Sequence, residues 1–296
     1  MTAVDDKLYL PRGTTSDGPF SLVVTPERAG WSYSGLLVLD LAPGGSHTWS
    51  TGEDETLVLP LNGGATVATE GHTFPLAGRP DVFSRVTDFA YVPRDATMTV
   101  SSRNGGRFAI CTTRCTRRLE PRYGPAENVP VELRGAGQAS RQVNNFCTPG
   151  VFEADKMIAV EVLTPGGNWS SYPPHKHDTD RGDAEAELEE IYYFESQGLG
   201  YQRVYGTPSR PIDVLAEVGT GDVVLVPHGW HGPSMAPPGY HLYYLNVMAG
   251  PSGDRAWRFC DDPAHGWVRS TWSGQELDPR LPLYDAGGPV PTENST

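Results

Sequence analysis

Several features that are common in proteins of this length are scarce in this 296-residue sequence. It has four cysteines and no Cys-x-x-Cys pair, which excludes a dense disulfide framework and predicts free thiols. No run of about 18 apolar residues occurs, which excludes a membrane span. The opening residues, MTAVDDKLYLPRG, have no basic region followed by an apolar core, so no secretory signal is predicted and we expect a cytoplasmic protein.

Positive charge is scarce as well. The chain has 23 Lys and Arg residues against 36 Asp and Glu residues, which gives a formal net charge of −13. Since such a field repels polyanions, nucleic acid and anionic membrane surfaces are excluded as predicted partners. A small anionic ligand is still compatible, provided that arginines close to its binding site supply the attraction.

Long helical patterns are missing, whereas turn residues are abundant. The 34 glycines and 27 prolines form no low-complexity tract but separate short apolar runs, which is typical of an all-β chain of many short strands. In the first half we predict strands at residues 20–24, 35–41, 55–61 and 65–69 and in DFAYVP, MTVSS and RFAICTT, with NGG and GG as turns. In the second half we predict them in MIAVEVLTP, EEIYYFE, LGYQRVYG, IDVLAEV, DVVLVP and YHLYYLNVMAG.

The two halves of the chain correspond weakly to one another. Residues 115–140 are rich in charge, proline and glycine, so we predict an N-terminal domain at residues 1–135 and a C-terminal domain at residues 136–296. The segment around His47 corresponds to SSYPPHKH…LEEIYYF, and FAYVPRDATMTV corresponds to VVLVPHGWHG. The first copy has one histidine where the second has two, which predicts that only the C-terminal half carries a metal site.

The densest group of candidate metal ligands lies in residues 170–194, SSYPPHKHDTDRGDAEAELEEIYYF. Side chains two apart on a strand share a face, so His175 and His177 point the same way. A glutamate at the start of the next strand and His231 in VVLVPHGWHG can complete the set. Three imidazoles and one carboxylate suit a divalent metal; zinc is the metal we expect, with manganese, iron and nickel left open.

These motifs resemble the two signature motifs of the cupin superfamily, whose members are small jelly-roll β-barrels. More closely, PPHKHDTD…LEEIYYF, QRVYG, GDVVLVPHGWHG, GYHLYYLNVMAGP, RQVNNF and DPAHGWVR are similar to the 5-deoxy-glucuronate isomerase family of inositol catabolism. The resemblance covers nearly the whole chain and implies an all-β bicupin of two jelly-roll-type barrels, the first of them degenerate. Two departures from the general cupin pattern are an acidic insert after His177 and the position of His231, one residue early.

The resemblance also implies an activity, the interconversion of 5-deoxy-D-glucuronate and 2-deoxy-5-keto-D-gluconate by an intramolecular oxidoreductase. A carbonyl moves between adjacent carbons when a proton is removed beside it and returned to its neighbour, and a metal stabilises the enediolate in between. The predicted partner is therefore a small anionic sugar acid, and we expect a homo-oligomer. Two alternatives are a non-catalytic cupin that binds a sugar acid and a metal-dependent cupin dioxygenase.

Five residues around the predicted metal receive specific roles. Neighbours on a strand face opposite ways, so only one of Glu189 and Glu190 can be a ligand. The count to the turn glycine in the general cupin motif favours Glu190, whereas the related ketol-isomerases allow Glu189; we predict Glu190 as the ligand and Glu189 as an outer carboxylate or general base. Tyr192 shares a face with Glu190 and is a candidate catalytic hydrogen-bond donor. Arg203 and Arg181 are the predicted substrate-binding residues, because a guanidinium fork suits a carboxylate.

Overall fold

The structure is a computed structural model that describes residues 7–289. Its regular structure in that range is almost entirely β, with 24 strands and two α-helices of four residues each, α1 (Pro26–Ala29) and α2 (Val268–Thr271). No helix in the described range is both long and apolar enough to cross a membrane. The predicted all-β class is confirmed.

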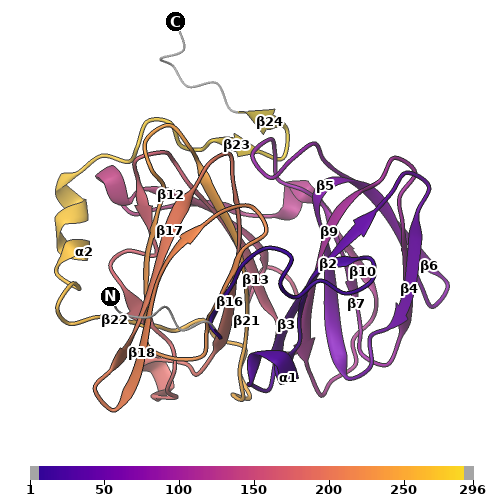
Figure 1. Cartoon of the computed structure of the whole chain (residues 1–296), viewed down its shortest axis with the longest axis horizontal. Helices are drawn as coiled ribbons and strands as arrows, with labels where there is room; N and C mark the ends of the chain where they lie inside the picture. The colour runs from indigo at the N-terminus through magenta and orange to yellow at the C-terminus, as the bar shows by residue number, and fades with distance from the viewer. Residues whose placement is uncertain (1–6, 290–296) are drawn as a thin grey trace, which may run out of the picture.

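The strands form two barrels that lie side by side (Figure 1). The strands of the N-terminal barrel are β2 (Phe20–Val24), β3 (Ser34–Leu41), β4 (Ser46–Ser50), β5 (Asp54–Thr69), β6 (His72–Arg79), β7 (Phe89–Val92), β8 (Thr97–Ser101), β9 (Gly106–Arg114) and β10 (Arg122–Gly124). Those of the C-terminal barrel are β1 (Tyr9–Leu10), β11 (Val131–Arg134), β12 (Arg141–Cys147), β13 (Ile158–Thr164), β14 (Trp169–Ser170), β15 (His175–Lys176), β16 (Glu189–Ser196), β17 (Gly200–Thr207), β18 (Arg210–Val218), β19 (Val223–Val226), β20 (Trp230–Met235), β21 (Leu242–Ala249) and β22 (Cys260–Asp261). A terminal hairpin consists of β23 (Tyr284–Asp285) and β24 (Gly288–Pro289), and short 3-10 helices cover Ala126–Asn128, Gly137–Ala139, Gly182–Ala184 and Trp272–Gly274.

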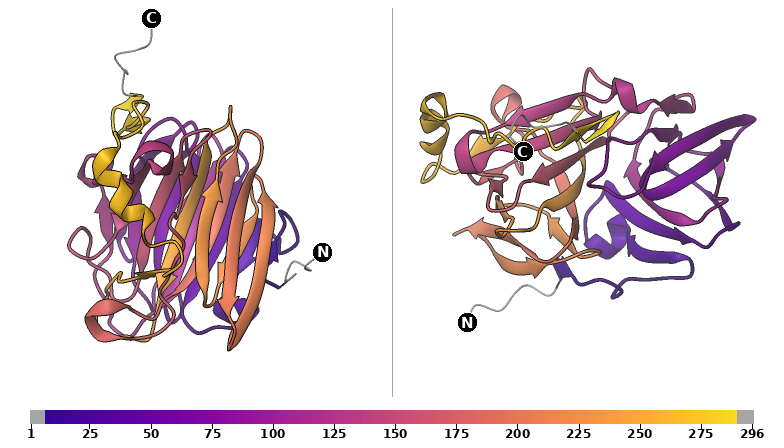
Figure 2. Two further views of the ribbon diagram at one scale, coloured as in Figure 1. Left: turned by 90° about the vertical axis from the view of Figure 1, so that its left-hand side faces the viewer. Right: turned by 90° about the horizontal axis from the view of Figure 1, so that it is seen from above.

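The larger sheets of the two barrels have the same strand order. In the N-terminal barrel it is β2-β3-β9-β5-β7-β10, and in the C-terminal barrel it is β12-β13-β21-β16-β19-β1, with β11 added beside β12. The second wall of the C-terminal barrel is the sheet β18-β17-β20-β15-β22, with β14 on β20. Figure 2 shows the two barrels from the side and from above. The weak correspondence in the sequence therefore reflects a repeated topology.

The NGG sequence at residues 62–64 is a bend and not the predicted turn. Strand β5 runs through it for 16 residues, and its pairing register shifts on both sides of Asn62. Gly63 adopts φ +76°, and a Cβ atom there would lie 2.5 Å from the carbonyl oxygen of Gly105. The glycine thus lets one strand pass from one wall of the barrel to the other, because it permits both the backbone angle and the close approach.

Each barrel receives an edge strand from the segment that precedes the other barrel. Strand β1 precedes the N-terminal barrel in the chain but pairs with β19 of the C-terminal barrel. Strand β10 precedes the C-terminal barrel in the chain but pairs with β7 of the N-terminal barrel. Strand β11 already pairs with β12 in the C-terminal barrel. Strand pairing therefore departs from the predicted division after residue 135 at β1 and at β11, which lie before it in the chain but belong to the C-terminal sheet.

Two carboxylates link the barrels in a reciprocal way. Glu55, at the start of β5, accepts hydrogen bonds from the backbone N–H groups of residues 155–157, just before β13, at 2.6–2.8 Å. Glu189, at the start of β16, accepts them from the backbone N–H groups of residues 32–34, at the start of β3, at 2.7–2.8 Å. Since β5 and β3 correspond to β16 and β13 in the shared strand order, the two contacts are equivalent.

The junction between the barrels also holds an apolar cluster and ion pairs, one of them completely buried. A single buried cluster contains side chains from both large sheets, among them Leu36 and Leu59 from one and Val160 and Leu245 from the other. Burial of this surface stabilises the junction by about 25 cal/mol for each Å² of apolar area. The completely buried Arg79 and Glu161 pair across it at 2.7 Å. The two barrels therefore pack on one another through an apolar cluster and a buried ion pair.

Candidate metal centre

Three of the four predicted metal ligands meet inside the C-terminal barrel. The ligand atoms of His177, Glu190 and His231 all lie within 4.8 Å of one another, and Glu190 Oε2 is 3.1 Å from Nε2 of both histidines. His175 flanks them, with its ring centroid 4.4 Å from that of His231. Glu190 comes from one wall and the histidines from the other, where β15 pairs with β20. The two walls thus bring together residues far apart in the sequence.

The outward ring nitrogens of these histidines are held by backbone carbonyls. Nδ1 of His177 lies 3.1 Å from the carbonyl oxygen of Leu188, Nδ1 of His175 lies 3.3 Å from that of Pro173, and Nδ1 of His231 lies 3.4 Å from that of Gly229. A carbonyl can only accept, so in each ring Nδ1 carries the proton and Nε2 of the neutral ring is left with a lone pair.

These lone pairs provide a test of whether the residues fit a metal. Nε2 of a neutral His177 and of a neutral His231 would each place a lone pair 3.1 Å from the carboxylate of Glu190. Acceptors facing one another in a buried site are unfavourable unless a cation stands between them, and His231 Nε2 has no other hydrogen-bond partner. Imidazole nitrogens and one carboxylate oxygen are the donor set of divalent zinc, manganese, iron and nickel sites, so the residues fit.

The surroundings set the protonation of the cluster. Burial opposes ionisation of Glu190, but the neighbouring His231 and His177 outweigh it and lower the pKa of the carboxyl to about 2. Burial, followed by repulsion from His231 and His177, holds the pKa of His175 well below its usual value. Burial lowers the pKa of His177, but the hydrogen bond to Glu190 and its charge outweigh burial and raise that pKa. Without a metal the site therefore holds an ionised Glu190 beside a neutral His175, and a cation would take the place of the proton between His177 and Glu190.

A group of hydroxyls adjoins the cluster. Ser171 Oγ lies 3.1 Å from the hydroxyl of Tyr192 and 3.0 Å from that of Tyr244, which also donates to Ser170 at 2.9 Å. Burial raises the pKa of Tyr192 well above its usual value, so its hydroxyl stays neutral. Ser171 has φ +48°, a rare angle for a residue with a Cβ atom. The hydroxyls can donate hydrogen bonds to an oxygen in the cavity.

An inner cavity of about 30 Å³ connects the cluster with these hydroxyls. It is lined by residues of both walls and of the segment after β21: Arg134, Arg141, Val143, Val162, Ser171, His175, Glu190, Tyr192, Tyr244, Asn246, Trp257, Phe259 and Arg269. This volume holds about one water molecule. A sugar acid can therefore enter only if part of the lining moves.

The two predicted substrate arginines lie outside this cavity. Arg203 is on the outer side of β17, where it pairs with Asp213 and donates to the carbonyls of Val204 and Val214. Arg181 is largely exposed and lies 3.5 Å from Glu185. Tyr192 lies in the cavity as predicted, whereas the carboxylate of Glu189 points to the N-terminal barrel and accepts the three backbone hydrogen bonds described above.

Sequence reasoning missed Arg141, Ser171, Tyr244 and Asn246 as residues of the cavity. Arg141 opens the strand RQVNNFC, in which every residue is buried despite four polar side chains. Such a strand could have been recognised as a polar barrel wall, since buried polar groups need partners or a ligand. Tyr244 and Asn246 are two residues apart on β21, so strand periodicity could have placed both on the same face of the barrel.

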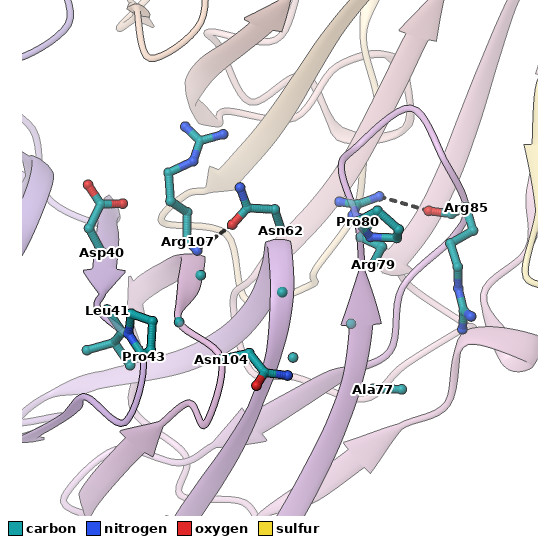
Figure 3. Close-up of a pocket in the computed structure, with 15 residues that line it drawn as sticks. Asp40, Leu41, Pro43, Asn62, Ala77, Arg79, Pro80, Arg85, Asn104 and Arg107 are labelled. Atoms are coloured by element: carbon teal, nitrogen blue, oxygen red, sulfur yellow. Dashed lines mark hydrogen bonds between the residues drawn. The ribbon is translucent and has the colours of Figure 1, made fainter.

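A wider hollow of about 860 Å³ lies elsewhere, in the N-terminal half (Figure 3). Its wall is built from glycine-rich turns with Asn62 and Asn104, and three arginines reach it. Two of them are already paired, Arg79 with Glu161 and Arg107 with Glu195. No cluster of metal ligands lies among its lining residues, in contrast to the smaller cavity.

Two packed jelly-roll barrels, with a histidine and carboxylate cluster inside one of them, define a bicupin. The chain belongs to the KduI/IolB family, whose sequence model matches residues 8–268. The 5-deoxy-glucuronate isomerase of Geobacillus kaustophilus is 42% identical over 267 residues, which cover 88% of this chain and 95% of that protein. The predicted family resemblance is confirmed.

Solved structures agree with this assignment. A crystal structure of an IolB-like protein from Salmonella typhimurium LT2 is similar with a TM-score of 0.82 and 35% identity, covering 88% of this chain and 98% of that chain. Bacillus subtilis oxalate decarboxylase, described with Mn(II) centres, is similar with a TM-score of 0.62 and 12% identity, covering 88% of this chain and 80% of that chain. The second likeness concerns the fold alone and confirms the predicted bicupin architecture.

Proposed function

We propose that the chain is a metal-dependent isomerase that interconverts 5-deoxy-D-glucuronate and 2-deoxy-5-keto-D-gluconate. The observation that carries the proposal is the buried cluster of His177, Glu190 and His231 inside a chain of this family. The curated relative that matches nearly the whole chain is named for the same activity. A cytoplasmic location and a homo-oligomeric state stay predictions.

The proposed metal ligands are His175, His177, Glu190 and His231, and zinc is the metal we propose, ahead of manganese, iron and nickel. Backbone carbonyls hold Nδ1 of all three imidazoles, which leaves Nε2 of each ring as its ligand atom, and Nε2 of His177 and of His231 already lies 3.1 Å from Glu190. A bound divalent ion would supply the positive charge that stabilises the enediolate form of the substrate. Elemental analysis of the purified protein identifies the ion.

One of the remaining steps, the movement of a proton between the two substrate oxygens, falls to the hydroxyls of the cavity. The isomerisation removes a proton from the carbon beside the carbonyl and returns one to the former carbonyl carbon, while protons also move between the two oxygens. Tyr192 has a neutral hydroxyl that is linked through Ser171 to Tyr244. We propose that Tyr192 donates a hydrogen bond to a substrate oxygen and that these three linked hydroxyls pass the proton between the two oxygens. The cavity has room for about one water molecule, so few waters compete for these hydrogen bonds.

We assign Glu189 a different role from its neighbour. Its carboxylate accepts three backbone hydrogen bonds from residues 32–34, which leaves little capacity to accept a proton from a substrate. We propose that Glu189 fixes the start of β16 against the N-terminal barrel, and thereby the position of Glu190.

One assay tests the proposal against the alternatives. Metal-loaded protein is incubated with 5-deoxy-D-glucuronate in the absence of oxygen, and the products are separated. Conversion to the keto acid is the expected result. A requirement for Fe(II) and oxygen would indicate the dioxygenase, and binding without conversion under any of the four metals would indicate a non-catalytic cupin. Neither alternative is favoured, since the curated relative is named as an isomerase.

A further inference from the structure

One guanidinium lies inside the C-terminal barrel without a carboxylate partner. Arg141 is 7% exposed, and within residues 7–289 its side chain makes one hydrogen bond, from Nη1 to the carbonyl of Ala139 at 3.0 Å. Arginine has five N–H donors and remains charged, so a buried guanidinium without a counter-ion costs free energy. Burial lowers the pKa of Arg141 to about 10, a shift that Tyr244 opposes and the charges of Arg134 and Arg269 reinforce; the group still carries its proton at neutral pH.

The two other arginines of the cavity are already engaged. Arg134 pairs with Glu132 at 2.6 Å and stacks over the ring of Trp257, with its guanidinium carbon 4.8 Å from the ring centroid. Arg269 binds Asp261 through two nitrogens and lies over the ring of Phe259 at 5.4 Å. Both therefore secure the segment that closes the cavity. Arg141 also lies over a ring, that of Trp272 at 5.7 Å, but it has no carboxylate partner in the described part of the chain, so it is the arginine of this lining whose donors remain free for an anion.

We propose that Arg141 binds the carboxylate of the sugar-acid substrate. The inference rests on the proposed function and assigns its specificity for an acid to one residue. Arg141 lines the same cavity as His175 and Glu190, so one small molecule can contact both the guanidinium and the metal centre. In 5-deoxy-D-glucuronate the carboxylate stands at the far end of the carbon chain from the aldehyde. The acid end binds to Arg141, and the end that isomerises faces the metal ligands.

Local attraction of this kind is required in a chain with a net charge of −13. Long-range steering is unfavourable for an anion, so the positive charge must lie within about 8 Å of it at physiological salt. Desolvation strengthens the ion pair, because the guanidinium has already lost its water when the carboxylate arrives. Arg203 offers no such pair, since its charge is used by Asp213 on the outer side of the barrel.

The test compares Arg141→Met, Arg141→Lys and Arg203→Met with the wild-type protein, all metal-loaded, in the conversion of 5-deoxy-D-glucuronate. Loss of a charge-assisted, two-point hydrogen bond is expected to raise KM roughly 100-fold in Arg141→Met, with a smaller change in kcat. Arg141→Lys keeps the charge but not the fork, and KM should rise roughly tenfold. Arg203→Met should stay within about twofold of wild type, as for other surface substitutions.

Stability provides a readout that separates binding from a structural role. A buried charge without a counter-ion destabilises the folded state, so Arg141→Met should keep or raise the melting temperature and should keep the bound metal. A large drop in melting temperature, together with a fall in kcat as large as the rise in KM, would overturn the proposal. An unchanged KM in Arg141→Met, or the 100-fold effect in Arg203→Met instead, would overturn it as well. If Arg141→Met does not fold, Arg141→Lys decides by whether its KM rises.

Failure of the proposed function can be told apart from failure of this inference. Calorimetry measures binding of 5-deoxy-D-glucuronate to the metal-loaded protein whether or not it is converted. Binding that is lost in Arg141→Met and retained in Arg203→Met would support the carboxylate site even if wild-type protein produced no keto acid. Conversion by the wild type with equal binding in both variants would leave the function intact and overturn the role of Arg141.

Discussion

At the scale of single residues, the histidines of the candidate metal centre use both ring nitrogens. His177 donates from Nδ1 to Leu188 and directs Nε2 at Glu190. We predict that His177→Ala lowers metal affinity by more than the roughly 10- to 100-fold that loss of an outer hydrogen-bond partner costs. Activity should fall in parallel while the barrel stays folded. Metal content and melting temperature measure these effects, and His72→Ala, exposed and in the other barrel, is the matched control.

Three of the four predicted metal ligands lie together in the structure, whereas the two predicted substrate arginines lie outside the cavity beside them. His175 and His177 are two residues apart, so strand periodicity predicts that they share a face, whereas Glu190 reaches them from the opposite wall of the barrel. Arg203 could not be placed in this way, because the pairing of β17 with β20 shifts register between Gln202 and Val204, and only the paired structure decides which face is inner. Arg141 could not be recognised from the sequence, because its ability to bind an anion depends on the absence of a carboxylate partner, which only the folded structure reveals.

At the scale of elements, the segment of residues 250–259 between β21 and β22 covers the cavity with Trp257 and Phe259. It pairs with no sheet and is mostly half-exposed. Arg134 and Arg269 stack on its two rings, while Arg255 donates to the carbonyls of Thr148 and Met157, so side chains rather than a strand ladder hold it. Because a cavity of about 30 Å³ cannot admit a sugar acid, this segment is the part of the lining expected to open.

Hydrogen exchange tests this expectation. The amides of residues 250–259 should exchange faster than those of β13, β16 and β21, and they should become protected when 5-deoxy-D-glucuronate binds. The strands provide an internal control, since their exchange should be the same in both states. Equal protection of the segment and the strands in free protein would show that the substrate enters by another route.

Glu55 at the start of β5 and Glu189 at the start of β16 make equivalent contacts, because each accepts three backbone hydrogen bonds from the other barrel. Glu189→Gln keeps the shape of the side chain but weakens three charge-assisted hydrogen bonds, so we predict a loss of about 1–3 kcal/mol in the free energy of unfolding. Glu55→Gln should cost a similar amount, although Glu55 lies in the barrel without the metal cluster. Denaturant unfolding and metal content are the measurements. A collapse of kcat in Glu189→Gln at unchanged stability would instead identify Glu189 as the general base.

At the scale of the whole molecule, the two barrels share a topology but not a site. Glu189 corresponds to Glu55 by its contacts, so Glu190 corresponds to the next residue in the N-terminal barrel, Thr56, whose buried hydroxyl has no hydrogen-bond partner. A threonine cannot replace a carboxylate ligand, and within residues 7–289 the one group of clustered metal ligands is that of the C-terminal barrel. We therefore predict one metal per chain. Elemental analysis that gives a ratio near two would contradict it.

The reciprocal links between the barrels have a consequence for the history of the chain. When each half makes the same contact to the other, the two halves are related by an approximate two-fold axis. The contacts of Glu55 and Glu189 are related in this way, and so are the pairings of the edge strands β1 and β10. Such an interface is the one that a strand-exchanged homodimer would have if its two chains were joined into one polypeptide. Fusion relieves the two copies of the need to be identical. One copy can then lose its metal ligands and persist as a fixed subunit, because the edge strand and the carboxylate that it provides are still required by its partner.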